Sequence, residues 1–248
     1  MSTYVISDIH GCYDTFMKLI NKINFSKNDT LYILGDIIDR GPKSYEVFEW
    51  IKNQDNVFMI LGNHEDMFIE NIKGILKVNE LFQMTSEDRT IAVKERLRTL
   101  KIYGYDEYGT LEKILSKYPA DVLFEMNDFF KALPLFYEIE VNNKIWTLVH
   151  ASCRKNIDLM TKDDFLWDRN LVTFGYGIAN KNIIFGHTPT ITEFYNYEGG
   201  IQCEEGIYKN NKYTKINIDC GCVWGRKNSK LGILRLEDMK DFYQKNID

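Results

Sequence analysis

Short apolar runs alternate with stretches of helical period along the first third of the chain. The apolar runs predict strands at 3–7, 30–34 and 56–61. Between them, apolar residues recur at the spacing of one helix face, which predicts helices at 13–25, at 44–53 and from about residue 65. Strands that alternate with helices are typical of βαβ units, so we predict an α/β fold with a parallel or mixed sheet.

The pattern changes between about residues 71 and 133. This stretch is charged, lacks strong β-runs and predicts helices at 111–118 and 121–133. Strands return after Pro134, and they are predicted at 135–141, 144–149, 182–185, 214–218 and 231–237. The first two of these flank Asn142-Asn143, a turn signal for a hairpin. We therefore predict one domain over 1–248 that carries a helical insertion or cap at about 71–133.

Polar and charged residues follow almost every predicted strand at once. All four histidines of the chain lie at such strand ends. In α/β sheets, sites assemble just beyond the carboxyl ends of the strands, so these residues are expected to converge. The polar residues at these ends are Asp8, His10, Asp36, Asp39, Arg40, Asn63, His64, His150, His187 and Asp219.

The residue types at these strand ends are those of a catalytic metal site. Asp8 and His10 lie two apart, so an extended backbone would point both side chains to one ion. Asp36 is placed to bridge two ions, and Asn63, His150 and His187 offer enough ligands for the second. Two ions about 3.5–4 Å apart can activate water and clamp a phosphoryl group. The alternative is a chance collection of polar loop residues, which the joint placement of the histidines disfavours.

Charge and cysteine usage narrow the class of protein. The net charge of −5 does not suggest a basic surface for nucleic acid, and no apolar run is long enough for a bilayer, so neither partner is expected. The five cysteines are odd in number and scattered, unlike a disulfide framework. The amino-terminal residues do not resemble a signal peptide. We expect a cytoplasmic protein.

An ordered set of motifs resembles one enzyme family. "SDIHG", "GDIIDRG", "GNHE", "VHA", "GHT" and "IDCGC" occur in this order between residues 7 and 222. The set resembles the phosphoprotein phosphatase family of calcineurin-like metallophosphoesterases, in particular its bacterial and bacteriophage branch of the lambda protein phosphatase type. The resemblance implies a four-layer α/β/β/α sandwich of mixed sheets with a dinuclear metal centre.

The resemblance also implies a role for each motif residue. His64 would be the general acid and Asp39 its supporting carboxylate, while Arg40, Arg169 and Asn63 would bind the phosphate. For Arg169 the alternative is a surface ion pair with a neighbouring aspartate, Asp164 or Asp168. The cofactors would be two divalent ions, with Mn²⁺ expected first and Fe or Zn as alternatives. The implied metal ligands are Asp8, His10 and Asp36 for one ion, and Asp36, Asn63, His150 and His187 for the other.

The expected reaction is hydrolysis of phosphomonoesters by in-line attack of a metal-bridging hydroxide. Phosphoserine and phosphothreonine proteins are the first expected substrates, because the counterpart of Asp39 is often not aspartate in bacterial tetraphosphatases. The alternatives are a symmetrical hydrolase of dinucleoside polyphosphates such as diadenosine tetraphosphate, and an inactive metal-binding scaffold. The partner would then be a phosphoprotein or a small phosphorylated molecule.

Two further groups of residues have plain structural interpretations. Cys220 and Cys222 are expected to be buried thiols beside the site, since one CxC motif is weak evidence for metal or redox chemistry. The aromatic pairs 129–130 and 136–137 are expected to pack in the core. Their alternative is an aromatic wall for a nucleobase or a peptide.

Overall fold

Two mixed five-stranded sheets form the centre of the molecule. The computed structural model describes residues 1–248 except 77–80, 82, 102–105, 107, 174–180 and 209–210. The first sheet has the order β10-β9-β1-β2-β3, with β1, β2 and β3 parallel and β9 and β10 antiparallel to their neighbours. Its strands are β1 (Thr3–Ile6), β2 (Thr30–Ile33), β3 (Val57–Met59), β9 (Leu231–Arg235) and β10 (Lys240–Gln244).

The second sheet has the order β4-β5-β6-β8-β7, in which β5, β6 and β8 are parallel. The predicted hairpin is confirmed, because β4 and β5 pair antiparallel around Asn142 and Asn143, whose φ angles of 53° and 58° suit a tight hairpin turn. The strands are β4 (Phe136–Val141), β5 (Lys144–Val149), β6 (Asn182–Phe185), β7 (Gln202–Tyr208) and β8 (Asn211–Asn217).

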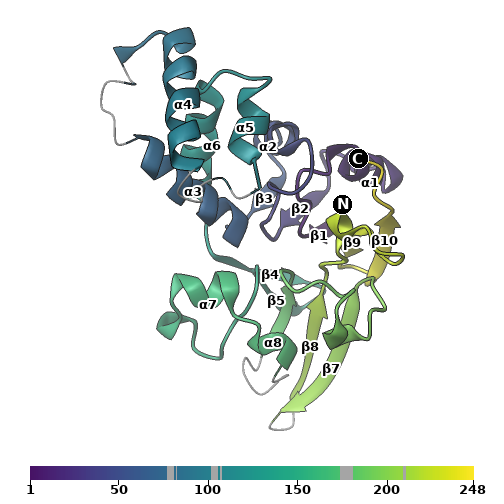
Figure 1. The fold of residues 1–248 in the computed structure, drawn as a ribbon. Coiled ribbons are helices and arrows are strands. Elements are labelled where there is room, and N and C mark those ends of the chain that lie inside the picture. Colours follow the sequence, from purple (N-terminus) through teal and green to yellow (C-terminus); the bar gives the residue numbers. More distant parts are fainter. Residues whose placement is uncertain (77–80, 82, 102–105, 107, 174–180, 209–210) are drawn as a thin grey trace.

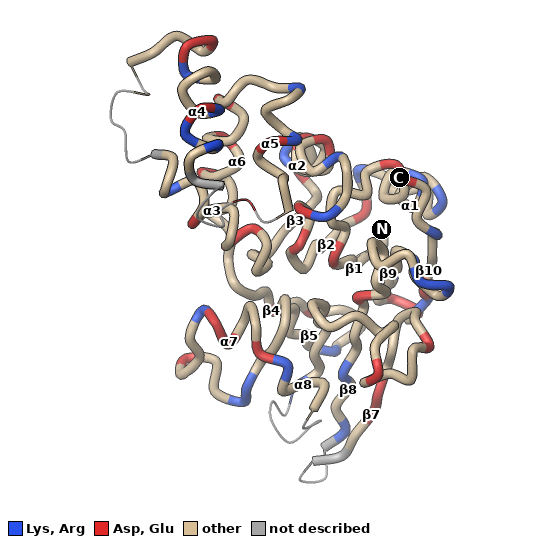
Figure 2. The backbone as a smooth tube through the Cα atoms, in the orientation of Figure 1, with Lys and Arg blue, Asp and Glu red and all other residues tan. Residues whose placement is uncertain are grey.

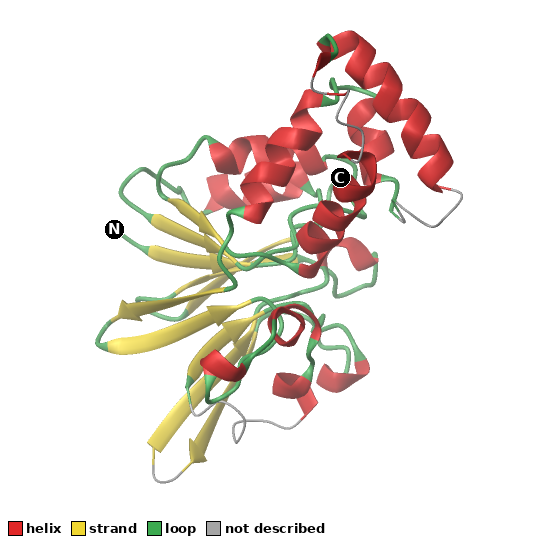
Figure 3. Cartoon of the chain, turned by 90° about the vertical axis from the view of Figure 1, so that its left-hand side faces the viewer, coloured by secondary structure: helices red, strands yellow, loops and turns green. Residues whose placement is uncertain are grey.

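Helices cover the outer face of each sheet, so the predicted four-layer α/β/β/α sandwich is confirmed (Figure 3). Successive side chains of β1 point to opposite faces of the first sheet. Val5 belongs to the apolar cluster between the sheets, whereas Tyr4 and Ile6 belong to the cluster beneath the helices. On the other side, Phe165 and Phe185 belong to one cluster beneath the second helical layer. The covering helices are α1 (Tyr13–Lys22), α2 (Ser44–Lys52), α7 (Lys162–Trp167) and α8 (Asn170–Thr173).

The described residues between 71 and 133 contain helices and no strand. These helices project from the sheets in Figure 1, and basic and acidic residues are mixed along them in Figure 2. Phe68 and Phe130 hold the first helix against the last, with ring centroids 5.4 Å apart. The helices are α3 (Asn63–Leu76), α4 (Ser86–Lys101), α5 (Thr110–Leu115) and α6 (Asp121–Lys131).

The pattern of apolar residues did not predict two of the strands. Both β7 and β10 are edge strands with charged residues, including Glu204 in β7 and Lys240 in β10. Edge strands tolerate charge because one side meets solvent, which weakens the apolar signal. The remaining short helices are η2 (Ile157–Leu159), η4 (Glu193–Tyr195) and η5 (Cys222–Trp224). Over the described ranges, we find no helix with the length and apolar character needed to cross a bilayer.

Candidate active site

The loops that follow the parallel strands of both sheets meet at one edge of the sandwich. His150, after β5, reaches across to the first sheet, where its Nδ1 lies 2.7 Å from the carbonyl oxygen of Leu34. Asp8, after β1, accepts the backbone N–H of His187, after β6, at 3.1 Å. These contacts join the two sheets at the carboxyl ends of their strands, where α/β folds place their sites.

The backbone around the first motif differs from the extended geometry that the sequence analysis assumed. Strand β1 ends at Ile6, and both Asp8 and His10 have left-handed backbones, with φ of 54° and 49°. Asp36 and His187 share this conformation, with φ of 55° and 64°. Left-handed residues other than glycine cost about 1–3 kcal/mol each and are often found at functional sites. A chain of tight turns, rather than an extended segment, therefore aims these side chains inward.

Two glycines allow the acidic side chains to approach the backbone. A Cβ atom on Gly62 would collide with the Asp36 carboxylate, and one on Gly186 would collide with the Asp8 carboxylate. Neither glycine has a positive φ in this structure. Their absence of a side chain, rather than their backbone freedom, is what the site requires.

One group of ligand atoms gathers around Asn63, at the start of α3. The Asn63 Oδ1 lies 2.9 Å from His150 Nε2 and 3.0 Å from His187 Nδ1. Since the Leu34 carbonyl oxygen can only accept, His150 carries its proton on Nδ1 and directs the lone pair of Nε2 into the group. No described residue bonds His187 Nε2, although this atom is buried. Asp36, His150 and His187 lie close enough to share a metal ion.

A second group lies on the other side of Asp36. His10 Nε2 is 3.8 Å from both Asp8 Oδ1 and Asp36 Oδ2, and His10 Nδ1 donates to the Ile38 carbonyl oxygen at 2.9 Å. The other carboxylate oxygen of Asp36 faces His150 Nε2 at 3.5 Å. Asp36 thus offers one oxygen to each group, which is the arrangement of a bridging ligand. The chemistry and positions of these donors fit two divalent ions.

Electrostatics favour cations at this position. Burial lowers the pKa of His10 to about 3 and that of His187 to about 2, so both imidazoles are neutral at pH 7, as metal ligation requires. Burial and then the charge of Asp36 raise the pKa of Asp8. Burial and then Asp8 raise the pKa of Asp219 well above its ordinary value. Buried carboxyl groups that resist ionisation beside neutral imidazoles are stabilised as anions by a bound cation.

His64 and Asp39 form a hydrogen-bonded pair beside these groups. His64 Nδ1 lies 2.7 Å from Asp39 Oδ2, while its Nε2 faces Asp36 Oδ2 at 3.9 Å. His64 is near enough to His10 and Asp36 to be a third metal ligand by distance alone. Burial by itself would lower the pKa of His64, but Asp36 and Asp39 raise it above the ordinary value. A histidine of raised pKa held by a carboxylate suits an acid better than a ligand.

Glu65, for which no role was predicted, belongs to the "GNHE" motif. This fully buried carboxylate accepts the backbone N–H groups of Asp36 at 2.8 Å, Ile37 at 2.9 Å and Gly62 at 3.0 Å. Burial, followed by the charge of Asp36, raises its pKa to about 7. Glu65 therefore ties the loop after β2 to the start of α3. The sequence signal that could have identified Glu65 is its position directly after His64 in this motif.

The two cysteines of the last motif are buried, as expected. Cys220 and Cys222 are 3 % and 1 % exposed. Burial raises the pKa of the Cys220 thiol, and a hydrogen bond with Cys12 followed by burial raises that of Cys222. Thiols that resist ionisation are poor nucleophiles and poor metal ligands, which disfavours the alternative roles.

A pocket of about 420 Å³ opens over the two groups of ligands. Arg40 and Arg169 line it together with three aromatic residues, Tyr108, Trp167 and Trp224. The aromatic pairs 129–130 and 136–137 are not among its lining residues, and Phe130 is fully buried. An aromatic wall is thus present, but other residues form it.

Arg169 does not make the surface ion pair considered as its alternative role. Its guanidinium donates to Thr188 Oγ1 at 2.8 Å and reaches the pocket. Asp164 and Asp168 instead pair with Arg154, at 2.6 and 3.3 Å. Among the described residues, no carboxylate pairs with Arg169, so its charge is available to an anion in the pocket.

Comparisons with known proteins agree with this geometry. A symmetrical bis(5'-nucleosyl)-tetraphosphatase from Buchnera aphidicola subsp. Schizaphis graminum is 28 % identical to this chain, and the match covers 98 % of this chain and 97 % of that protein. A solved structure of a proposed diadenosine tetraphosphatase has a TM-score of 0.61 at 18 % identity, over 97 % of this chain and 91 % of that one. A protein serine/threonine phosphatase from Saccharomyces cerevisiae has a TM-score of 0.59 at 16 % identity, over 100 % and 81 %.

The two structural similarities concern the fold, since both identities are low. The family assignment comes from the sequence, because the family model of the calcineurin-like phosphoesterases matches residues 1–219. The histidines and aspartates that could hold two ions lie within this range, as the metal-dependent chemistry of such enzymes requires. The chain belongs to the calcineurin-like phosphoesterase family.

Proposed function

We propose that this protein is a symmetrical dinucleoside tetraphosphate hydrolase, which adds water across the central phosphate linkage of diadenosine tetraphosphate and releases two molecules of ADP. The full-length similarity to relatives named as symmetrical tetraphosphatases carries this proposal. The first expectation, a phosphoserine and phosphothreonine phosphatase, has only the similarity of fold to a yeast enzyme in its support. The aspartate at position 39 suggested that branch, but one motif residue is weaker evidence than similarity over the full length of the chain.

The lining of the pocket supports a nucleotide substrate. The guanidinium groups of Arg40 and Arg169 suit a polyphosphate, because they present several donors in a plane. Trp167 and Trp224 remain 45 % and 43 % exposed although they line the pocket, so aromatic surface is available beside these arginines. Aromatic side chains stack on nucleobases whatever the base, whereas a phosphoserine side chain offers nothing to stack.

Two divalent ions would be held at the bridging aspartate. Asp8, His10 and Asp36 would bind one ion, and Asp36, Asn63, His150 and His187 the other; the His187 nitrogen at this position is Nδ1, 3.0 Å from Asn63 Oδ1. When bound, the ions supply an activated water and neutralise negative charge on the phosphate. Their identity follows availability as much as affinity, with Mn²⁺ expected first and Fe or Zn as alternatives.

The side chains around the ions have separate tasks in the proposed reaction. Arg40 donates to His10 Nε2 at 2.6 Å and lines the pocket, where its guanidinium would bind the phosphates. Arg169, which also lines the pocket, would hold a second phosphate oxygen, and Asn63 would orient the group under attack. His64, held through Nδ1 by Asp39, would deliver a proton from Nε2 to the departing phosphate oxygen.

A comparison of substrates tests the proposed function. With Mn²⁺ present, kcat/KM should be higher for diadenosine tetraphosphate than for a phosphoserine peptide or p-nitrophenyl phosphate, and ADP should be the sole nucleotide product. A faster reaction on the peptide would restore the protein phosphatase assignment. Formation of ATP and AMP would show asymmetrical cleavage, and no turnover of any substrate by metal-loaded protein would favour the inactive scaffold.

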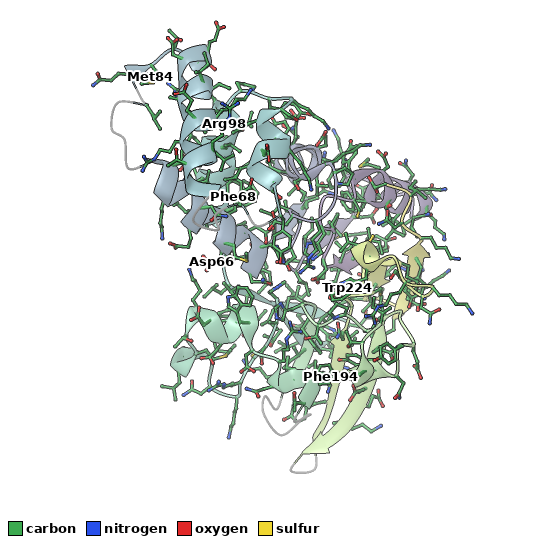
Figure 4. The ribbon with its side chains drawn as sticks, in the orientation of Figure 1. Asp66, Phe68, Met84, Arg98, Phe194 and Trp224 are labelled. Atoms are coloured by element: carbon green, nitrogen blue, oxygen red, sulfur yellow. The ribbon has the colours of Figure 1, made fainter. Side chains whose placement is uncertain are left out.

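Trp224 is expected to contribute to base binding. Replacing it by alanine should weaken competitive inhibition by ADP about tenfold, since stacking is worth roughly 1–3 kcal/mol per base, and should leave inhibition by pyrophosphate unchanged. Phe194, labelled with Trp224 in Figure 4, offers a matched control, because it is 50 % exposed but is not among the residues that line the pocket. Phe194→Ala should change neither constant. Equal weakening of ADP and pyrophosphate by Trp224→Ala would contradict base stacking.

A further inference from the structure

The helical segment between residues 71 and 133 returns to the candidate active site at the start of α5. Thr110, the first residue of this helix, donates its hydroxyl to Asp39 Oδ1. The other oxygen of the same carboxylate is bonded to His64 Nδ1 at 2.7 Å. The three side chains are almost fully buried, with 2 % exposure for Thr110 and His64 and 7 % for Asp39. A chain of hydrogen bonds therefore runs from the helical segment to His64.

The backbone at this point is firmly held. Asp106 bonds the first turn of α5, where its two oxygens accept the N–H groups of Leu111 at 3.0 Å and Glu112 at 3.2 Å. The ring centres of Tyr108 and His64 lie 5.0 Å apart. The Arg40 guanidinium lies 5.6 Å from the centre of the Tyr108 ring. The helical segment thus places the Thr110 hydroxyl and the Tyr108 ring against the pair formed by His64 and Asp39.

The bond from Thr110 matters because of how the Asp39 carboxylate is held. The backbone N–H of Asp39 donates to Ser44 Oγ at 3.1 Å, which holds the main chain but leaves the carboxylate free to rotate. A hydroxyl bonded to Oδ1 removes this freedom and keeps Oδ2 directed at His64. Hydrogen bonds to a charged acceptor are about twice as strong as neutral ones, so this one can set the orientation.

We propose that Thr110 is a positioning residue, through which the helical segment orients Asp39 and thereby His64 for proton delivery. Thr110 is not among the residues that line the pocket, and its hydroxyl bonds Asp39, through which it would act. The inference rests on the acid role of His64 in the proposed function. It assigns to the helical segment a part in the reaction that no motif indicates.

The test uses aryl phosphates that range from p-nitrophenyl phosphate to phenyl phosphate, because poorer leaving groups depend more on an acid. Thr110→Val keeps the shape and removes the hydroxyl, and it should lower kcat on phenyl phosphate on the order of tenfold while changing kcat on p-nitrophenyl phosphate little. KM and metal content should stay as in the parent protein. Thr110→Ser keeps the hydroxyl and should restore kcat on phenyl phosphate.

Thr90→Val is the matched control within the same helical segment. The Thr90 hydroxyl donates to the Ser86 carbonyl oxygen at 2.8 Å and accepts the N–H of Ala120 at 2.9 Å, so its loss removes hydrogen bonds within the helical segment and leaves the bond to Asp39 in place. This variant should keep the leaving-group dependence of the parent. If Thr110→Val does not fold, Thr110→Ala removes the same hydroxyl with a smaller side chain and should give the same selective loss.

His64→Ala distinguishes the positioning role of Thr110 from the acid role of His64. A steep leaving-group dependence in His64→Ala but not in Thr110→Val, or an equal loss on every substrate in Thr110→Val, would overturn the role of Thr110 alone. If His64→Ala itself lost no more on phenyl phosphate than on p-nitrophenyl phosphate, the acid role in the proposed function would fail instead. Selective loss in both, with recovery in Thr110→Ser, supports the proposal.

Discussion

An Asp36→Asn variant is expected to bind neither metal ion firmly and to lose activity by a factor on the order of 10³ or more, which corresponds to about 4 kcal/mol of transition-state stabilisation. This is the largest effect on activity that we expect from one substitution. Asp36 Oδ1 faces His150 at 3.5 Å and Asp36 Oδ2 faces His10 at 3.8 Å, so the same side chain serves both ligand groups.

The amide of asparagine has nearly the same shape as the carboxylate, but it carries no charge and offers only one oxygen. In place of the bridge, one of the two groups would face an NH₂ group, which cannot bind a cation. The surrounding imidazoles lower the pKa of Asp36 although burial by itself would raise it, so the native residue is a carboxylate anion at this position. The variant therefore loses a charge as well as a ligand.

Metal content by elemental analysis and kcat in the presence of Mn²⁺ measure this effect. Asp66→Asn is the matched control, because Asp66 lies on α3, is labelled in Figure 4 and pairs with Lys162 at 2.6 Å, away from the ligand groups. The control should retain its metal and its rate. An Asp36→Asn protein that still held two ions per chain would show that Asp36 does not bridge them.

A Glu65→Ala variant should show the largest loss of stability, about 3 kcal/mol or more in the free energy of unfolding. The Glu65 carboxylate is the acceptor for three buried N–H groups, those of Asp36, Ile37 and Gly62. A buried donor without a partner costs roughly 1–3 kcal/mol, and alanine provides no acceptor for any of the three.

Urea denaturation of metal-free protein measures this loss separately from any loss of bound ions. Glu70→Ala is the control on the same helix, since Glu70 is exposed and pairs with the exposed Lys73, and it should change stability by less than about 0.5 kcal/mol. Glu65→Gln keeps one acceptor oxygen and should fall between the two. Equal stabilities of Glu65→Ala and Glu70→Ala would refute the structural role of Glu65.

Much of the fold could be predicted because its signals are local. The pattern of apolar residues predicted most of the strands and the helices α1 and α2, and the turn residues Asn142 and Asn143 predicted the hairpin, whereas the short helices α7 and α8 were not predicted. The edge strands β7 and β10 were missed because solvent on one side permits charged residues there. The branch within the family could not be predicted in the same way. The motifs indicated the protein phosphatase branch, whereas the full-length relatives are named as tetraphosphatases. Motifs that bind metal and phosphate describe the reaction more closely than the rest of the substrate.

The positions of the predicted site residues agree with convergence at the strand ends, but the detailed geometry does not follow from the sequence. Asp8 and His10 were expected to share one side of an extended segment, and instead left-handed turns direct them. Their ligand roles stay predictions, which the Asp36→Asn measurement addresses. The pocket aromatics, Trp167 and Trp224 among them, carry no pattern that separates them from core aromatics.

Sequence alone predicts the types and order of the candidate ligand residues and the strands that present them, because residue chemistry and backbone period are properties of neighbours along the chain. Which distant groups support the site depends on how the chain packs. Thr110 and Asp39 are 71 residues apart, and Glu65 and Asp36 are 29 apart. No local pattern records such pairs, since a buried hydrogen bond depends on where packing brings its donor and its acceptor.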